Sequence, residues 1–191
     1  SRLEGLYRKG LDNHHAAIFD TRAVLADAHT VRLLKDGRTV TAEHILIATG
    51  GRSNPHKALL GHELCISSSE AFDLRQLPKT IVIEGGGYIA VEFANIFHGL
   101  GVETILIYRG EKILRGFDED LRDHLAAEMQ KKGIEIRTGS HVSRIDKSGE
   151  GIRVTLEDGA AFGAGQIMFA TGRIPNVAGL GLENAGVHVT P

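Results

Sequence analysis

The hydrophobic pattern of the chain changes its period near residue 85. A β-branched apolar run, Ile81-Val82-Ile83, is followed by three glycines at positions 85–87, and apolar residues then recur at helical spacing. This change predicts a buried strand, a tight turn and a helix that packs one face on a sheet. The expected apolar face consists of Ile89, Phe93, Ile96, Phe97 and Leu100.

Similar patterns continue after this helix. Residues 104–108 form a second buried strand candidate and residues 134–137 a third. Between them a second helix is expected from Asp118, a good N-cap, to Gly133, a helix-ending glycine. Its apolar positions lie four residues apart: Leu121, Leu125 and Met129.

The pattern becomes alternating after residue 140. Residues 142–145 and 151–156 alternate apolar and polar positions, with turn residues between them and again at Asp158-Gly159. Alternation with short turns predicts an antiparallel meander. Residues 166–170 then return to a buried strand.

The first fifty residues carry shorter signals. A helix is expected over about residues 2–14, and Asp36-Gly37 predicts a hairpin turn leading into residues 39–41. Three short strands are expected, over residues 17–19, 30–34 and 44–48.

The order β-α-β-α-β, meander, β predicts an α/β fold. It describes a doubly wound, Rossmann-like parallel sheet in which an antiparallel β-meander replaces one crossover. Loop residues 50–56 and 172–178 bracket these elements. The sequence therefore predicts one whole domain inserted between two pieces of another.

The glycine-rich turn has the spacing of a dinucleotide site. Gly85, Gly87 and Ala90 fill the three positions of the G-x-G-x-x-G/A pattern. They would form the tight turn, leave room for a pyrophosphate and let helix and strand pack closely. The alternative is an ordinary glycine turn, but its place between a strand and a helix favours nucleotide binding.

Two arginines follow the second strand of this unit. Arg109 and Arg115 lie 24 and 30 residues after Gly85, where an NAD site would carry an acid for the ribose 2′-hydroxyl. Guanidinium groups suit a 2′-phosphate because they give paired, charge-assisted hydrogen bonds. A solvated basic loop is the alternative. The fingerprint, together with the family resemblance described below, favours recognition of the NADP phosphate.

The amino-acid composition limits the partners and metal sites that the chain can be expected to have. The chain is 42% hydrophobic and 24% charged with a formal net charge of -2, which gives no reason to expect nucleic acid or an anionic membrane as partner. Cys65 is the only cysteine, so a reducing, cytoplasmic setting is expected and the residue is interpreted as inert. The ten histidines show no metal-ligand spacing, and no metal is expected.

Four motifs, spread in order over nearly the whole chain, resemble those of one family. They are Ala48-Thr49-Gly50-Gly51, residues 85–92, residues 109–118 and Ala170-Thr171-Gly172-Arg173-Ile174-Pro175-Asn176. In these motifs the chain resembles the pyridine nucleotide-disulfide oxidoreductases, most closely their bacterial glutathione reductase branch. The resemblance implies an FAD domain interrupted by an NADP domain. Residues 1–52 would be part of the FAD-binding domain, 53–173 the NADP-binding domain and 174–191 the return to the FAD-binding domain.

The resemblance also implies an activity. In the intact enzyme NADPH would reduce FAD, which would reduce a disulfide that in turn reduces glutathione disulfide, within a homodimer. The family's redox cysteine pair and His-Glu acid/base pair are not in this sequence, and Ser1 is no initiator Met, so a fragment without catalytic residues is expected. The alternatives are trypanothione or mercuric reductase, or a non-catalytic NADPH-binding module.

Residue roles follow from the same resemblance. Tyr88 would be a gate over the flavin that moves when nicotinamide enters, and Glu92 would lie near the flavin. The NADP contacts would be Gly85, Gly86, Gly87, Ile89, Ala90, Glu92, Arg109, Arg115 and Gly172. The FAD contacts would be Ala23, Ala48, Thr49 and Gly50. Glu84 departs from the family, and an acid beside phosphates weakens binding unless it is paired or points away.

Overall fold

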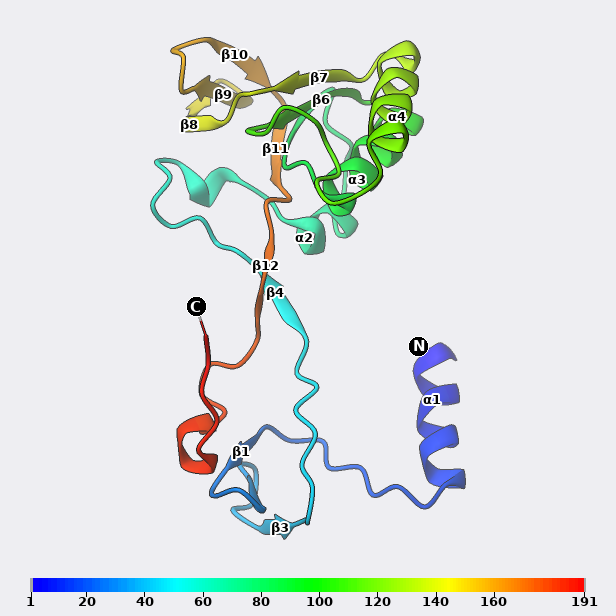
Figure 1. Cartoon of the computed structure of the whole chain (residues 1–191), viewed down its shortest axis with the longest axis vertical. Coiled ribbons are helices and arrows are strands. Elements are labelled where there is room, and N and C mark those ends of the chain that lie inside the picture. The colour runs from blue at the N-terminus through cyan, green and yellow to red at the C-terminus, as the bar shows by residue number, and fades with distance from the viewer. Residues whose placement is uncertain (1, 191) are drawn as a thin grey trace. The chain divides into compact units, whose positions relative to one another are not determined.

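The computed structural model describes residues 2–190, so Ser1 and Pro191, the ends of two predicted segments, lie outside it (Figure 1). The described chain forms two compact units. One unit comprises residues 51–174, and the other joins the residues up to 50 with those from 175 onward.

A four-stranded parallel sheet is the centre of the 51–174 unit. Its strand order is β11-β5-β6-β7, and every neighbouring pair is parallel. The strands are β5 (Thr80–Glu84), β6 (Glu103–Tyr108), β7 (Glu135–Thr138) and β11 (Gln166–Phe169). The predicted α/β fold with a parallel sheet is thereby confirmed.

Side chains alternate between the two faces of this sheet and belong to two separate cores. Ile81 and Ile83 of β5 pack in the core that includes helices α3 (Tyr88–Gly99) and α4 (Glu119–Lys132). Val82, between them, packs in the core of the antiparallel strands. Figure 1 shows α3 and α4 together on one side of the sheet and β8, β9 and β10 on the other.

The face of α3 that packs on the sheet differs from the predicted one. The buried residues are Ala90, Val91, Phe93, Ala94 and Phe97. The two alanines are fully buried, and their small side chains allow the helix to approach the strands closely. The helix is therefore turned so that Ile96 and Leu100 are 46% and 58% exposed, and their prediction as core residues was wrong.

Helix α4 begins and ends where the sequence predicts. The Asp118 carboxylate accepts the backbone N–H groups of Asp120 and Leu121 at 3.0 and 3.3 Å. Gly133 ends the helix with a φ of 104°, a conformation that favours glycine. Of the predicted apolar row, Met129 is buried, Leu125 packs against the core, and Leu121 is exposed.

The predicted meander is present. It consists of β8 (Val142–Ser148), β9 (Gly151–Leu156) and β10 (Ala161–Ala164), paired antiparallel in that order. The strands β4 (Gly51–Ser53) and β12 (Arg173–Pro175) pair with each other. The short helices η1 (His62–Leu64) and α2 (Ser68–Phe72) lie between β4 and β5.

The flanking unit contains α1 (Arg2–Asn13), β1 (Ala23–Leu25), β2 (Thr30–Leu33), β3 (Thr39–Thr41) and η2 (Leu182–Ala185). The hairpin predicted at Asp36-Gly37 is confirmed by the antiparallel pairing of β2 with β3. The strands predicted at residues 17–19 and 44–48 were wrong. Within the described chain neither segment pairs with another strand, and a β-strand requires a ladder partner. On its other side β2 pairs antiparallel with β1, a strand that the sequence did not predict.

Candidate functional site

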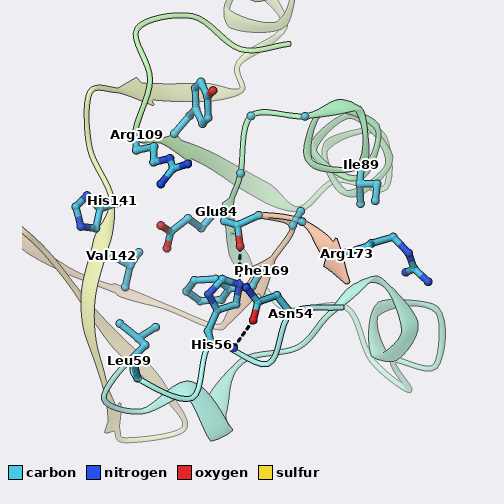
Figure 2. Close-up of a pocket in the computed structure, with 18 of the residues that line it drawn as sticks. Asn54, His56, Leu59, Glu84, Ile89, Arg109, His141, Val142, Phe169 and Arg173 are labelled. Carbon is cyan, nitrogen blue, oxygen red and sulfur yellow. Dashed lines mark hydrogen bonds between the residues drawn. The ribbon is translucent and has the colours of Figure 1, made fainter. Parts of the chain in front are cut away.

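A groove of about 1200 Å³ lies at the carboxyl ends of the parallel strands. It is lined by the segment between β4 and η1, the glycine turn after β5, the loop after β6, the loop before β8 and the segment after β11. Figure 2 shows side chains from residues 54–59, the loop after β6, the loop before β8 and the end of β11 facing the same space, among them His56, Arg109 and His141. Open parallel sheets bind ligands at this edge, so the groove is the candidate site.

Gly85 shapes the first part of the turn. Its φ is 148°, in a region that side chains rarely adopt, and an added Cβ would meet the Ala170 carbonyl oxygen at 2.5 Å. The same Cβ would lie 3.2 Å from Cβ of Ala90, the buried third residue of the pattern. Both positions must therefore be small for helix α3 to lie close to β5 and β11.

The other two glycines of the turn have different surroundings. A Cβ on Gly86 would lie 2.4 Å from the Tyr108 ring, so the absence of a side chain at position 86 makes room for that ring. A Cβ on Gly87 would meet no atom within 4 Å, so this residue leaves room beside the groove. Gly87 is also the N-cap of α3, and no described side chain caps that helix end. Free N–H groups at a helix N-terminus attract phosphate.

The loop after β6 brings Arg109 and Arg115 to the groove. Both side chains are exposed, and neither makes a hydrogen bond or ion pair with any residue in the range 2–190. Two unpaired guanidinium groups beside a helix N-terminus form a site for an anionic, phosphate-bearing ligand.

Arg122 of α4 fixes this loop from behind. Its Nε donates to the Ile113 carbonyl oxygen at 2.7 Å and its Nη2 to that of Lys112 at 2.8 Å. The Lys112 ammonium in turn donates to Glu119 at 3.0 Å and to Asp123 at 2.8 Å. The loop is thus anchored to α4 through its middle residues, while the two arginines at its ends remain free.

Glu84 is the unusual residue of the groove. Only 8% of the residue is exposed, and within the described chain its Oε2 has no hydrogen-bond partner. Burial raises the pKa of this carboxyl to about 7. A hydrogen bond from the Val142 backbone and the positive charge of Arg109 both lower the pKa, but they do not outweigh the effect of burial. Figure 2 shows the carboxyl directed into the groove on the side of Arg109 and His141.

A second cluster lines the groove beneath Glu84. The His56 ring packs on Phe169 with a centroid distance of 4.7 Å, and its Nε2 lies 2.5 Å from the Thr171 hydroxyl. The Asn54 side chain accepts the His56 backbone N–H at 3.3 Å. From the sequence, no site role was assigned to Asn54, His56, Tyr108 and His141. Residues 51–56 were interpreted as a loop, and Tyr108 was interpreted as the last residue of a buried strand. The Asn-Pro-His triplet was the available local signal.

The structure brings most of the predicted NADP residues together. The residues that line the groove are Gly85, Gly86, Gly87, Tyr88, Ile89, Arg109, Arg115 and Gly172. Ala90 lies behind the turn, and Glu92 is exposed on α3 outside the groove lining.

The predicted FAD residues belong to the flanking unit. Ala23 lies on β1, and Ala48, Thr49 and Gly50 are exposed. Asn176 donates its backbone N–H to the Gly50 carbonyl oxygen at 2.9 Å. The Asn176 side-chain amide donates to the Thr49 backbone carbonyl oxygen at 3.4 Å.

Cys65 is half-buried, and burial raises the pKa of its thiol to about 12. It therefore stays protonated near neutral pH and is a poor nucleophile.

Residues 2–190 contain no group of three His, Cys, Asp or Glu that could hold a metal ion. None of the helices described is long and apolar enough to cross a membrane.

The whole chain, residues 1–191, matches the family model described as pyridine nucleotide-disulphide oxidoreductase. The chain belongs to this family. The predicted family resemblance is therefore confirmed.

Three relatives illustrate how the chain compares within the family. It is 43% identical to a glutathione reductase of Burkholderia cepacia and 46% identical to one of Nostoc sp., in each case over 98% of this chain and 41% of the relative. It is 42% identical to a trypanothione reductase of Trypanosoma congolense over 78% of this chain and 31% of the relative. The chain thus spans about two fifths of the length of the two glutathione reductases.

A solved structure has a similar fold. It is the Cu(II) complex of a mutant of the HOCl-induced flavoprotein disulfide reductase RclA from Escherichia coli. The TM-score is 0.84 at 28% identity, covering 98% of this chain and 44% of that chain. The likeness to this structure agrees with the α/β fold class that the parallel sheet and the meander of this chain indicate.

Proposed function

We propose that the groove of the 51–174 unit binds NADPH, and that the intact protein is a flavin-dependent glutathione-disulfide reductase. The observation that carries the proposal is the pair of unpaired guanidinium groups, Arg109 and Arg115, beside the uncapped N-terminus of α3. An NAD site would instead present an acid after β6.

The chain's own residues fit a bound NADPH. The N–H groups at the start of α3 would hold the pyrophosphate, and the open space beside Gly87 would admit it. Arg109 and Arg115 would hold the 2′-phosphate through charge-assisted hydrogen bonds. The groove is large enough for a cofactor of this kind.

At the nicotinamide end, the first turn of α3 would orient the ring. Tyr88 is 59% exposed and lines the groove, so it can move aside without disturbing the core. Gly172 would form the opposite edge, and Glu92, one turn along the helix, would lie near the flavin. Bound NADPH would supply a hydride to FAD, from which electrons pass to a disulfide and then to glutathione disulfide.

The flanking unit would contribute to FAD binding. We propose Ala23, Ala48, Thr49 and Gly50 as FAD contacts. The segments 1–52 and 174–191 would be parts of the FAD-binding domain, and residues 53–173 would be the NADP-binding domain. Two relatives named glutathione reductase match 98% of this chain, against 78% for a trypanothione reductase of similar identity, which supports glutathione disulfide as the substrate. Trypanothione disulfide and mercuric ion are the alternatives. A cytoplasmic homodimer is proposed for the intact protein.

Titration of the 191-residue chain with NADPH and with NADH tests the proposal. Fluorescence or calorimetry should give a tighter dissociation constant for NADPH, because NADH lacks the 2′-phosphate. Equal affinity for the two cofactors would overturn the assignment.

A further inference from the structure

Glu84 is a buried acid placed immediately before the glycine turn. It is the last residue of β5 and points to the same side of the sheet as Val82, toward the meander. The groove wall around it includes the apolar residues Leu59, Val142 and Phe169 (Figure 2). Burial of an unpaired polar group in such surroundings costs stability, so its presence requires an explanation.

The polar groups around Glu84 leave its Oε2 without a partner in the described chain. The charged or titratable side chains that line the same groove are His56, Lys57, Tyr88, Tyr108, Arg109, Arg115, His141, Glu157 and Arg173. Among the described residues, Arg109 acts on Glu84 only through its charge, and the Val142 backbone donates a hydrogen bond to the carboxyl. His141 is paired with Glu157, with 2.9 Å between Nε2 and Oε1. Behind Glu84, the Cys65 thiol is uncharged.

A phosphate-bearing ligand would be sensitive to the charge of this carboxyl. The ionised form would repel the ligand from the same groove, whereas the neutral acid would not and could donate its O–H to an anion. We propose that Glu84 takes part in nucleotide binding as a neutral carboxylic acid, so that filling the groove is coupled to the uptake of one proton. The inference rests on the proposed binding of NADPH and adds a residue that controls it.

The titration range of Glu84 makes this coupling measurable. Burial raises the pKa of the carboxyl to about 7, so both forms are populated near neutral pH. A bound anion would raise this pKa further. By contrast, burial lowers the pKa of His56, which is therefore neutral above pH 7.

The experiment measures NADPH and NADH binding to the 191-residue chain between pH 7 and pH 9. The 2′-phosphate has a second pKa of about 6, so it adds little titration in this range, and NADH provides a probe without that group. If only the neutral acid binds, the dissociation constants of both cofactors should rise by up to about tenfold per pH unit. Calorimetry in two buffers of different ionisation enthalpy should show proton uptake approaching one per nucleotide.

Two variants isolate the residue. Glu84→Gln should remove the pH dependence and bind NADPH at least about tenfold more tightly than the wild-type chain at pH 9, because the amide stays neutral. Glu103→Gln is the matched control, since Glu103 is an exposed acid at the start of β6 that accepts from the Thr80 hydroxyl at 2.9 Å. It should behave as the wild-type chain.

The outcomes separate this inference from the proposed function. NADPH binding that requires the arginines but neither varies with pH nor takes up a proton would overturn the role of Glu84 alone. No NADPH binding at any pH would overturn both. The proton count is made on the wild-type chain, so it decides the question even if the Gln variant fails to fold.

Discussion

The backbone N–H of Leu114 donates to the carbonyl oxygen of Gly86 at 2.5 Å. This bond joins the arginine-bearing loop to the middle of the glycine turn. Leu114 has a φ of 55°, an unusual value for a residue with a side chain, and it is buried. The two regions proposed to hold the 2′-phosphate and the pyrophosphate therefore form one connected structure.

Arg122 holds the same loop from the side of α4, and its removal should affect cofactor choice. In Arg122→Leu the carbonyl groups of Lys112 and Ile113 lose their donors, which should destabilise the chain by about 2–3 kcal/mol. NADPH binding should weaken by roughly three- to tenfold while NADH binding changes little, because only NADPH uses the loop arginines. Arg122→Lys should recover part of the loss.

Urea denaturation and cofactor titration measure these two effects. Arg144→Leu is the control, since Arg144 forms an exposed pair with Asp146 on β8 and should contribute no more than about 1 kcal/mol. A stability loss in Arg122→Leu with an unchanged ratio of NADPH to NADH affinity would show that Arg122 does not position the loop.

The two neighbouring glycines of the turn should respond differently to alanine. Gly86→Ala forces a methyl group against the Tyr108 ring and should cost about 1–3 kcal/mol of folding stability. Gly87→Ala has space and an extended backbone, so its stability should stay within about 0.5 kcal/mol of wild type.

Gly87→Ala, which should leave folding stability nearly unchanged, should weaken cofactor binding. Its methyl group would enter the space proposed for the pyrophosphate, so NADPH and NADH should weaken together. Calorimetry of both cofactors with the folded Gly87→Ala chain is the measurement. Unchanged affinity would exclude the turn as the pyrophosphate site.

Glu84 should make stability depend on pH. Its folded pKa of about 7 lies above the ordinary value of 4.5, so the folded state holds the proton more tightly than the unfolded state. The contribution of Glu84 to the free energy of unfolding is therefore most favourable below about pH 4.5, and it is lost as the pH rises through 7. The full effect at pH 8 and above is on the order of 3 kcal/mol.

Comparison of the wild-type chain with Glu84→Gln isolates this effect. Urea denaturation should show similar stability at pH 5 and a more stable variant at pH 8. An equal difference at both values would mean that Glu84 is not buried as an acid.

The sequence was most informative where local patterns decide the structure. The apolar run before Gly85, the Asp118 N-cap and the Asp36-Gly37 turn each act within a few residues, and all three predicted elements are present. The order of these elements was enough to predict the parallel sheet. Residues 44–48 failed because an apolar run shows β propensity but does not reveal whether a partner strand exists.

The remaining details depend on contacts between distant residues. The rotation of α3 about its axis follows from the close packing of Ala90 and Ala94 on the sheet. The sequence of the helix alone does not reveal which of its residues contact the strands. The requirement for glycine at position 86 comes from the Tyr108 ring, and the position of His56 comes from Phe169 and Thr171. Such pairs become visible only when the sheet brings the strand ends together.

The central claim is that Arg109 and Arg115 recognise the 2′-phosphate of NADPH. A hydrogen bond to a charged group contributes about 1.5–3 kcal/mol, so either alanine variant should weaken NADPH binding roughly 10- to 150-fold. NADH binding should change little, and high salt should reduce the preference for NADPH because both side chains are exposed. Arg75→Ala, at an exposed position outside the groove, is the control.

The decisive measurement is calorimetric titration of Arg109→Ala, Arg115→Ala and the control with NADPH and NADH at one pH and salt concentration. We expect a large loss for NADPH alone in the two loop variants and none in the control. Equal losses for NADPH and NADH would contradict the assignment and would mean that these arginines support the fold or contact the pyrophosphate.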